Sequence, residues 1–317
     1  MQSEKKEIVN GFAHQVMGEV AKRLGDGYDL DVCELLKNNG IYRTAIRISK
    51  GAESISPIIY LDRLYDLYQS GNKDMDSIVD SVCETYNENS DNYAFDENIL
   101  LDYDRVKDRL CFRLISAERN SILLKNTPHI VVCADLAVIF FVLVSDVGDE
   151  DMATVIVQND LLDSWGITVA EAHEVAMKNT QQLLPGSIKG MSAVMQDYLM
   201  MDDDEIRECF ELPGEEGAGD QYKDLLYVCT NSSSSRGAGV ILYDGFLKDF
   251  ADEIGSDLYI LPSSVHEVLV VPMSELTDME QLKNMVKEVN ADHVPPIDIL
   301  SDNVFIYHRE TDQISVC

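Results

Sequence analysis

The chain has 317 residues, of which 45% are hydrophobic, and this is enough for one large buried core or two smaller ones. Its 57 acidic residues against 25 basic residues give a formal net charge of -32 at neutral pH, and a field of this sign repels phosphate backbones and anionic lipid head groups. We therefore expect neither nucleic acid nor a membrane surface as a partner, and the charge favours a basic protein surface instead. No cofactor is indicated, and the oligomeric state is left open.

The first residues and the cysteines predict a cytoplasmic protein. The N-terminal stretch 1–12 has neither the apolar core nor the small-residue cleavage site of a secretory signal. The longest apolar run, 136–144, is far shorter than the roughly 20 residues that cross a bilayer. The seven cysteines are odd in number and contain no C-x-x-C pair, which favours buried thiols in a reducing compartment over disulfides or a metal site.

The first hundred residues predict a mainly helical section with short strands. Over 2–24, apolar side chains recur at one-turn intervals on one face of a helix: Ile8, Phe12, Val16, Val20 and Leu24. Alternating or β-branched runs between 41 and 60 indicate extended segments. Two helices are expected next, one ending at Gly71 and one capped by Asp74.

The segment 109–200 predicts a central sheet followed by helices. Runs rich in Val, Ile and Phe at 109–116, 129–145 and 153–158 indicate either single strands or, in the second run, a strand pair broken near Ala134–Asp135. If the chain turns there, Asp135 is predicted to be a turn or cap residue rather than an acid catalyst. Thr168 and Glu171 form a capping-box pattern, which predicts a helix over 169–183, and a further helix covers 192–200.

The last third of the chain predicts an acidic connector and a compact mixed unit. Residues 201–223 are dominated by acids, so we expect an exposed link. After it, strands at 225–230 and 238–242, a helix at 243–254, and strands at 257–261 and 265–271 form a predicted ββαββ unit. A second capping box at Thr277–Glu280 opens a helix, and two strand-like runs follow it. The predicted fold class is α+β with antiparallel-rich mixed sheets, in sections 1–108, 109–200, 201–223 and 224–317.

Several blocks together carry a family likeness: YLDRLYDLY, TPHIVVCADLAVIF, WGITVAEAHEVAMKNT, LYVCTN, GAGVILYDG, LYILPSSVHEVLVVP and MVKEVN. Over nearly the whole chain they resemble an uncharacterised bacterial family, domain of unknown function 5688. Residues 109–272 also resemble domain of unknown function 1444. The resemblance implies an intracellular protein of anaerobic gram-positive bacteria, and it implies no activity, cofactor or catalytic residue.

The best-placed polar cluster is Ser263, Ser264, His266 and Glu267. A serine nucleophile and a histidine base suggest a hydrolase, with Ser264, His266 and Glu267 as the catalytic candidates. On a strand over 265–271, however, His266 and Glu267 point to opposite faces, and local capping by the turn also explains the serines.

The neighbouring loop 231–239 supplies Asn231 and Arg236, which with Ser263 are the candidate ligand-binding residues. It lacks the third glycine of G-x-G-x-x-G and the lysine of a P-loop, so a polar hairpin loop is the simpler interpretation. The chain has two His-Glu pairs, at 173–174 and 266–267, and neither completes the zinc motif H-E-x-x-H. Met177 and Val270 occupy the second histidine position, so no metal site is expected.

Every catalytic pattern thus lacks one required member. The sequence favours a non-enzymatic binding or interaction module over an enzyme. The alternative is a hydrolase or small-ligand-binding protein that uses the cluster at 263–267.

Overall fold

A computed structural model gives the fold of the chain, and it divides into two compact units, residues 1–102 and 103–317. The residues that the structure describes are 2–50, 58–90, 98–144, 153–200, 225–274 and 278–317. Within these ranges no helix is both long enough and apolar enough to cross a membrane. The class is α+β, as predicted, and every strand pair in the described residues is antiparallel.

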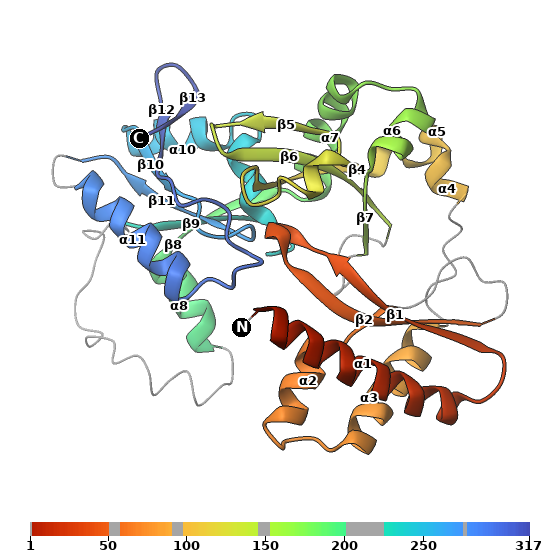
Figure 1. Cartoon of the computed structure of the whole chain (residues 1–317). Helices are drawn as coiled ribbons and strands as arrows, with labels where there is room; N and C mark the ends of the chain where they lie inside the picture. The colour runs from red at the N-terminus through yellow and green to blue at the C-terminus, as the bar shows by residue number, and fades with distance from the viewer. Residues whose placement is uncertain (1, 51–57, 91–97, 145–152, 201–224, 275–277) are drawn as a thin grey trace. The chain divides into compact units, whose positions relative to one another are not determined.

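The first unit is a three-stranded sheet, in the order β1-β2-β3, covered on one face by helices α1, α2 and α3 (Figure 1). Its elements are α1 (Gln2–Leu24), β1 (Tyr28–Leu36), η1 (Asn38–Gly40), β2 (Tyr42–Lys50), β3 (Ile58–Tyr60), α2 (Asp62–Gln69), α3 (Met75–Ser90) and α4 (Asn98–Leu101). The predicted cap is present, since Asp74 accepts a hydrogen bond from the Ser77 amide at 2.9 Å. Gly71 follows α2 with a φ of 73°, the backbone conformation that glycine adopts most readily.

The core of this unit lies between the helices and the sheet. Ile46 and Ile48 of β2 are fully buried against Val16 and Val20 of α1 and against apolar side chains of α3. The predicted stripe on α1 is correct except at its start. Ile8 is 55% exposed and Val9 is buried in its place, because the 3.6-residue period of a helix drifts away from a strict spacing of four.

The second unit contains two antiparallel sheets. Its elements are α5 (Tyr103–Val106), η2 (Lys107–Arg109), β4 (Leu110–Ser116), η3 (Leu123–Lys125), β5 (His129–Val132), β6 (Leu136–Leu143), β7 (Thr154–Ile156), α6 (Asn159–Trp165), α7 (Val169–Leu183), β8 (Gly186–Gly190), α8 (Met191–Met200), β9 (Tyr227–Asn231), η4 (Gly237–Leu242), α10 (Phe246–Ile254), β10 (Leu258–Leu261), β11 (Val268–Pro272), α11 (Met279–Asp292), β12 (Phe305–His308) and β13 (Gln313–Val316).

The smaller sheet has the order β4-β6-β5, and β7 pairs with the end of β6. β4 and β6 are buried along their whole lengths. The chain turns between β5 and β6, as predicted, with Cys133 and Ala134 at φ values of 46° and 64°. Helix α7 packs against β4 and begins with the predicted capping box, in which Thr168 and Glu171 each bond the other's backbone amide.

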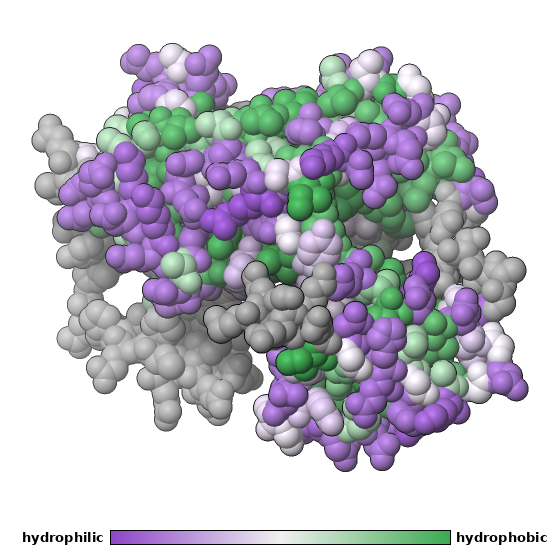
Figure 2. Space-filling model, viewed as in Figure 1, coloured by the Kyte–Doolittle hydropathy of each residue, from purple (hydrophilic) through white to green (hydrophobic). Residues whose placement is uncertain are grey.

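The larger sheet has the order β13-β12-β10-β11-β9-β8. Helix α11 packs on one face, where Leu282 and Val286 contact Tyr259 and Leu261, and hydrophilic side chains cover the outward side of the helix (Figure 2). Helix α10 lies on the opposite face, where the Phe250 ring meets Tyr227 at 4.8 Å between centroids. The sequence predicted a capping box at Thr277–Glu280 at the start of α11. Asp278 is the N-cap residue of this helix, and Thr277 falls outside the described residues.

Two parts of the predicted ββαββ unit are wrong. Residues 238–242 belong to a buried 3-10 helix, η4, because Gly237, Ala238 and Gly239 carry too little side chain to hold the backbone away from its neighbours. Residues 265–267 precede the strand, which begins at Val268. Two further strands, β1 and β8, were not predicted, and the acidic connector at 201–223 lies outside the described residues.

Candidate functional site

The loop after β9 is held together by Asn231. Its side-chain oxygen accepts hydrogen bonds from the Ser233 amide (3.1 Å) and hydroxyl (2.8 Å), and its amide nitrogen donates to the Ser235 carbonyl at 3.1 Å. Asn231 is 4% exposed, so these contacts are shielded from water. Asn231, predicted as a ligand-binding residue, therefore fixes the shape of the loop through its own polar atoms.

The end of the loop is packed against the segment that carries His266. The Gly237 amide and the Thr230 hydroxyl both donate to the His266 carbonyl, at 2.8 Å each. A β-carbon on Gly237 would lie 2.3 Å from Thr230 Oγ1 and 2.7 Å from that carbonyl oxygen, so only glycine fits. Arg236, just before it, has a φ of 51°.

The His266 ring is held from two sides. Its Nδ1 accepts a hydrogen bond from the Arg236 amide at 3.2 Å, and its Nε2 lies 3.3 Å from Asp298 Oδ1. A neutral ring with its proton on Nε2 satisfies both contacts, because Nδ1 must be the acceptor. The side chain is about one-third exposed, so the ring is neither in a closed apolar pocket nor free of neighbours.

The two serines do not face the His266 ring. The Ser264 hydroxyl accepts a hydrogen bond from the His266 backbone amide at 3.0 Å, and Ser264 is 6% exposed. The Ser263 carbonyl accepts from the Leu300 amide, while Ser264 bridges to Ile299. The serines thus form a local turn paired with 298–301, and no hydrogen bond joins the Ser264 hydroxyl to the imidazole, as a nucleophile and its base require.

Glu267 points elsewhere, into a groove of about 730 Å³ on the larger sheet. The groove is lined by Ser187, Lys189, Met191, Val194, Val228, Thr230, Asn231, Ser232, Ser234, Glu267 and Leu269. The strand register places its floor on one face of β8, β9 and β11, where Lys189, Val228 and Leu269 form one row. This is the face that α11 covers farther along the sheet. The volume is within the usual range for ligand sites.

The predicted residues therefore separate into three places. Glu267 and Asn231 line the groove, His266 and Arg236 meet behind the loop, and Ser263 and Ser264 belong to the turn. Ser187 and Lys189 were not predicted as site residues, because strand β8 was not predicted. Its signal was a short alternation, G-S-I-K-G, directly after Pro185.

The sequence matches one family over residues 9–309, a family of unknown function (DUF5688). The chain belongs to this family. The match extends over both compact units and over every residue of the groove. No curated protein and no solved structure matches the DUF5688 chain significantly. The likeness of residues 109–272 to domain of unknown function 1444 stays a prediction.

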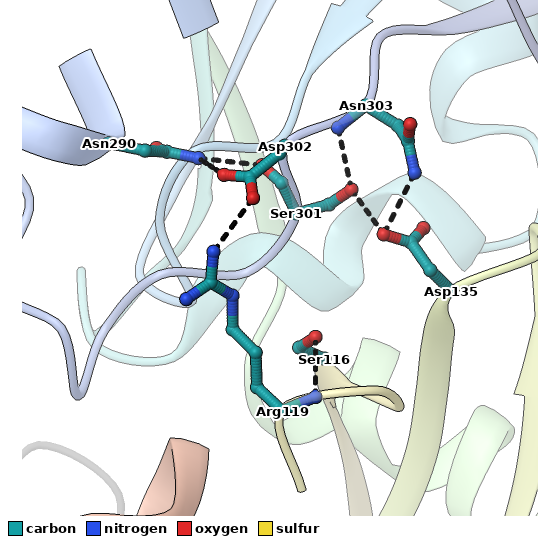
Figure 3. Close-up of polar contacts among 7 residues, drawn as sticks. All are labelled: Ser116, Arg119, Asp135, Asn290, Ser301, Asp302 and Asn303. Atoms are coloured by element: carbon teal, nitrogen blue, oxygen red, sulfur yellow. Dashed lines mark hydrogen bonds and ion pairs between the residues drawn. The ribbon is translucent and has the colours of Figure 1, made fainter. Parts of the chain in front are cut away.

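A second polar cluster of this DUF5688 chain joins the smaller sheet to the larger sheet of residues 103–317 (Figure 3). Asp135 Oδ2 accepts hydrogen bonds from the Ser301 hydroxyl (2.6 Å) and from the Asn303 amide group (3.0 Å). Asp302 pairs with Arg119 at 2.7 Å and with Asn290 at 2.7 Å. These contacts link the β5–β6 turn and the β4–β5 connection to the segment before β12, so Asp135 acts as a structural link.

The described residues include no group of three or more His, Cys, Asp or Glu side chains that could hold a metal ion. The acids of Figure 3 are engaged by Ser, Asn and Arg instead. The surroundings of Glu267 open onto the groove of about 730 Å³, which is large enough for a ligand.

Proposed function

We propose that the chain is a non-enzymatic binding protein of the cytoplasm, whose groove receives a positively charged group of a basic protein partner. The observation that carries this proposal is the groove of about 730 Å³ with Glu267 in its wall. Val228 and Leu269 form an apolar part of its floor beside Lys189, and hydroxyl and amide side chains also line the groove. Such a surface suits a side chain with an apolar stem and a cationic end, as in lysine or arginine.

The groove has an acidic residue, Glu267, and a basic residue, Lys189, at different positions along it. Glu267 directly precedes β11, and Lys189 lies on β8, two strands away. Continuing the strand register by one residue gives about 12 Å between their Cα atoms. A cationic group is attracted to the Glu267 end and repelled from the Lys189 end. The net charge of -32 attracts basic partners from a distance and adds to this preference.

The geometry around His266 argues against the hydrolase alternative. Ser264 is turned toward the backbone amide of His266, and the ring nitrogens face Arg236 and Asp298. Proton transfer from the hydroxyl to the ring would require the turn to be remade, together with its pairing to 298–301.

The cysteines support the cytoplasmic part of the proposal. All six that the structure describes are free thiols, and three of them, Cys83, Cys111 and Cys229, are buried. Thiols of this kind persist where the surroundings are reducing.

The test is binding of fluorescent pentapeptides with a central lysine, arginine or norleucine, measured by anisotropy. We expect the lysine and arginine peptides to bind and to weaken with added salt. Glu267→Gln should weaken binding by roughly 10- to 100-fold, the equivalent of about 1.5–3 kcal/mol for a charge-assisted hydrogen bond. The matched control is Glu288→Gln, which removes an equal charge from the exposed side of α11.

Equal losses in both variants would mean that only the overall charge matters, and the groove would not be the site. Turnover in a hydrolase screen that disappears in both Ser264→Ala and His266→Ala would replace the binding function with the enzymatic one.

A further inference from the structure

A buried arginine in the smaller sheet, Arg113, has a side-chain donor that makes no hydrogen bond within the described residues. Arg113 lies on β4 opposite Ile139 of β6, and it is 6% exposed. Its Nε is enclosed, and no residue that the structure describes accepts a hydrogen bond from that atom. Buried guanidinium groups are normally paired with a carboxylate or with several carbonyl oxygens, since an unpaired buried charge is costly.

The guanidinium group of Arg113 contacts an aromatic ring. The Arg113 guanidinium carbon lies 5.7 Å from the centroid of the Phe141 ring, a cation–π contact. A ring face attracts the charge, but it accepts none of the hydrogen bonds that the five N–H groups of arginine can donate. The Nε–H of Arg113, one donor of the planar guanidinium fork, therefore remains available for an oxyanion.

A second cation approaches the same place. Leu184 packs with Phe141, and the carbonyl of the next residue, Pro185, accepts a hydrogen bond from Ser232 at 2.9 Å, so the loop after β9 lies beside this cluster. Helix η4, which follows Arg236 directly, packs against β4. Two independent contacts thus bring the loop that carries Arg236 close to the strand that carries Arg113.

The electrostatics agree with this arrangement. Burial, and to a lesser degree the charge of Arg236, lowers the pKa of Arg113 to about 9. The residue is thus still cationic at neutral pH, and no carboxylate of the described residues acts on that pKa. Arg236 is exposed to solvent on one side. Partial burial lowers its pKa, and the nearby negative charge of Asp298 partly offsets this by raising it. Asp298 is shared with His266, so it offsets one charge of the group and leaves Arg113 uncompensated.

We propose that Arg113, assisted by Arg236, binds the oxyanion group of a small molecule, a phosphate or a carboxylate. Each of these groups has two oxygen atoms that can accept two parallel hydrogen bonds from a guanidinium fork. The net charge of -32 repels anions from the protein as a whole, whereas two arginines at one place attract an anion there. The site is separate from the groove, whose proposed ligand has the opposite charge.

The test uses the full chain with sodium phosphate and sodium acetate as probes, against sodium chloride of equal ionic strength. Calorimetry gives the stoichiometry, and the melting temperature gives the stabilisation by ligand. We expect saturable binding of one anion per chain and a melting temperature that rises with its concentration. Phosphate binding alone identifies the ligand group as a phosphate, acetate binding alone as a carboxylate, and either result supports the site.

Arg113→Met should remove the response. Because it replaces an unpaired buried charge with an apolar chain of similar length, it should fold and melt at or above the wild-type temperature in chloride. Arg236→Met should weaken binding, and Arg113→Lys should lose most of it, since lysine lacks the fork. The control Arg63→Met, an exposed arginine on α2, should respond like wild type.

The proposal is overturned if neither anion binds saturably to the wild type, or if Arg113→Met responds like the wild type. Should Arg113→Met fail to fold, the two remaining variants decide, and an unchanged response in both also overturns it.

Discussion

Replacing Gly237 with alanine tests whether the loop after β9 is locked to the His266 segment. The new β-carbon would lie 2.3 Å from Thr230 Oγ1, 2.5 Å from the Asn231 backbone nitrogen and 2.7 Å from the His266 carbonyl oxygen. Two of these atoms belong to the backbone, which cannot rotate away as a flexible side chain can. The loop and the end of β9 must therefore separate.

The size of the effect follows from three contributions. Overpacking in a well-packed site costs about 1–3 kcal/mol. Separation also weakens the two hydrogen bonds that the His266 carbonyl accepts from Gly237 and Thr230, each worth about 1 kcal/mol. Alanine also lowers the conformational entropy of the unfolded chain, which offsets about 0.4–1 kcal/mol of this destabilisation. We expect the free energy of unfolding to fall by about 2–4 kcal/mol.

The assay is urea unfolding followed by the fluorescence of Trp165, the single tryptophan, which is buried in the unit 103–317. For a slope of about 2 kcal/mol per M, the midpoint should drop by about 1–2 M. Gly11→Ala is the control, because its β-carbon on α1 would meet no described atom within 4 Å, and it should leave this transition unchanged. A midpoint for Gly237→Ala at or above that of the wild type would refute the steric argument.

Three further predictions use the same unfolding assay or a labelling assay. Thr168→Ala removes the capping box of α7 and should lower the free energy of unfolding by about 0.5–2 kcal/mol; no change would mean that the cap contributes nothing. Ser301→Ala leaves Asp135 without its 2.6 Å donor and should cost about 1–3 kcal/mol, whereas a neutral result would remove the structural role given to this link. Burial raises the pKa of Cys111 to about 11 and that of Cys229 to about 12, from 9.0, so the folded state favours the neutral thiols. The contribution of the two thiols to the free energy of unfolding is complete below pH 9 and is lost as the pH rises through these values. At pH 8, iodoacetamide should label both thiols only after unfolding; labelling of the folded protein would mean that they are exposed.

Local patterns predicted the elements whose signals lie within a few residues. The capping box at Thr168, the helix stripe from Phe12 to Val20 and the chain reversal near Ala134 depend on side chains next to one another in the sequence, and all three are correct. Such signals work because a cap or an apolar stripe needs no knowledge of the rest of the fold.

The errors occurred where distant contacts decide the local structure. Residues 238–242 have the apolar content of a strand, but Gly237 and Ala238 are bonded to His266 and Val265, about 28 residues away, and the chain then tightens into η4. β8 was missed because its five residues include two glycines and only one large apolar side chain.

The candidate site was predicted only in part for the same reason. Sequence proximity put Ser264, His266 and Glu267 into one cluster, whereas the structure orients them to a turn, to Asp298 and to the groove. Arg113 was not singled out, because a single arginine within an apolar strand carries no pattern of its own. Its unsatisfied Nε becomes visible only when the surroundings of the side chain are known.

The order of strands in the larger sheet also determines when the protein can be completed during synthesis. β12 is next to β10, although 43 residues separate the end of one from the start of the other. The unit 1–102 has all of its core as soon as it leaves the ribosome, so it can fold early. The buried strand β10 must wait, with one edge unpaired and able to recruit another chain, until residues 305–308 arrive. A chain held on a stalled ribosome in this interval is therefore prone to aggregate, because residues 305–308 have not yet covered that edge of β10.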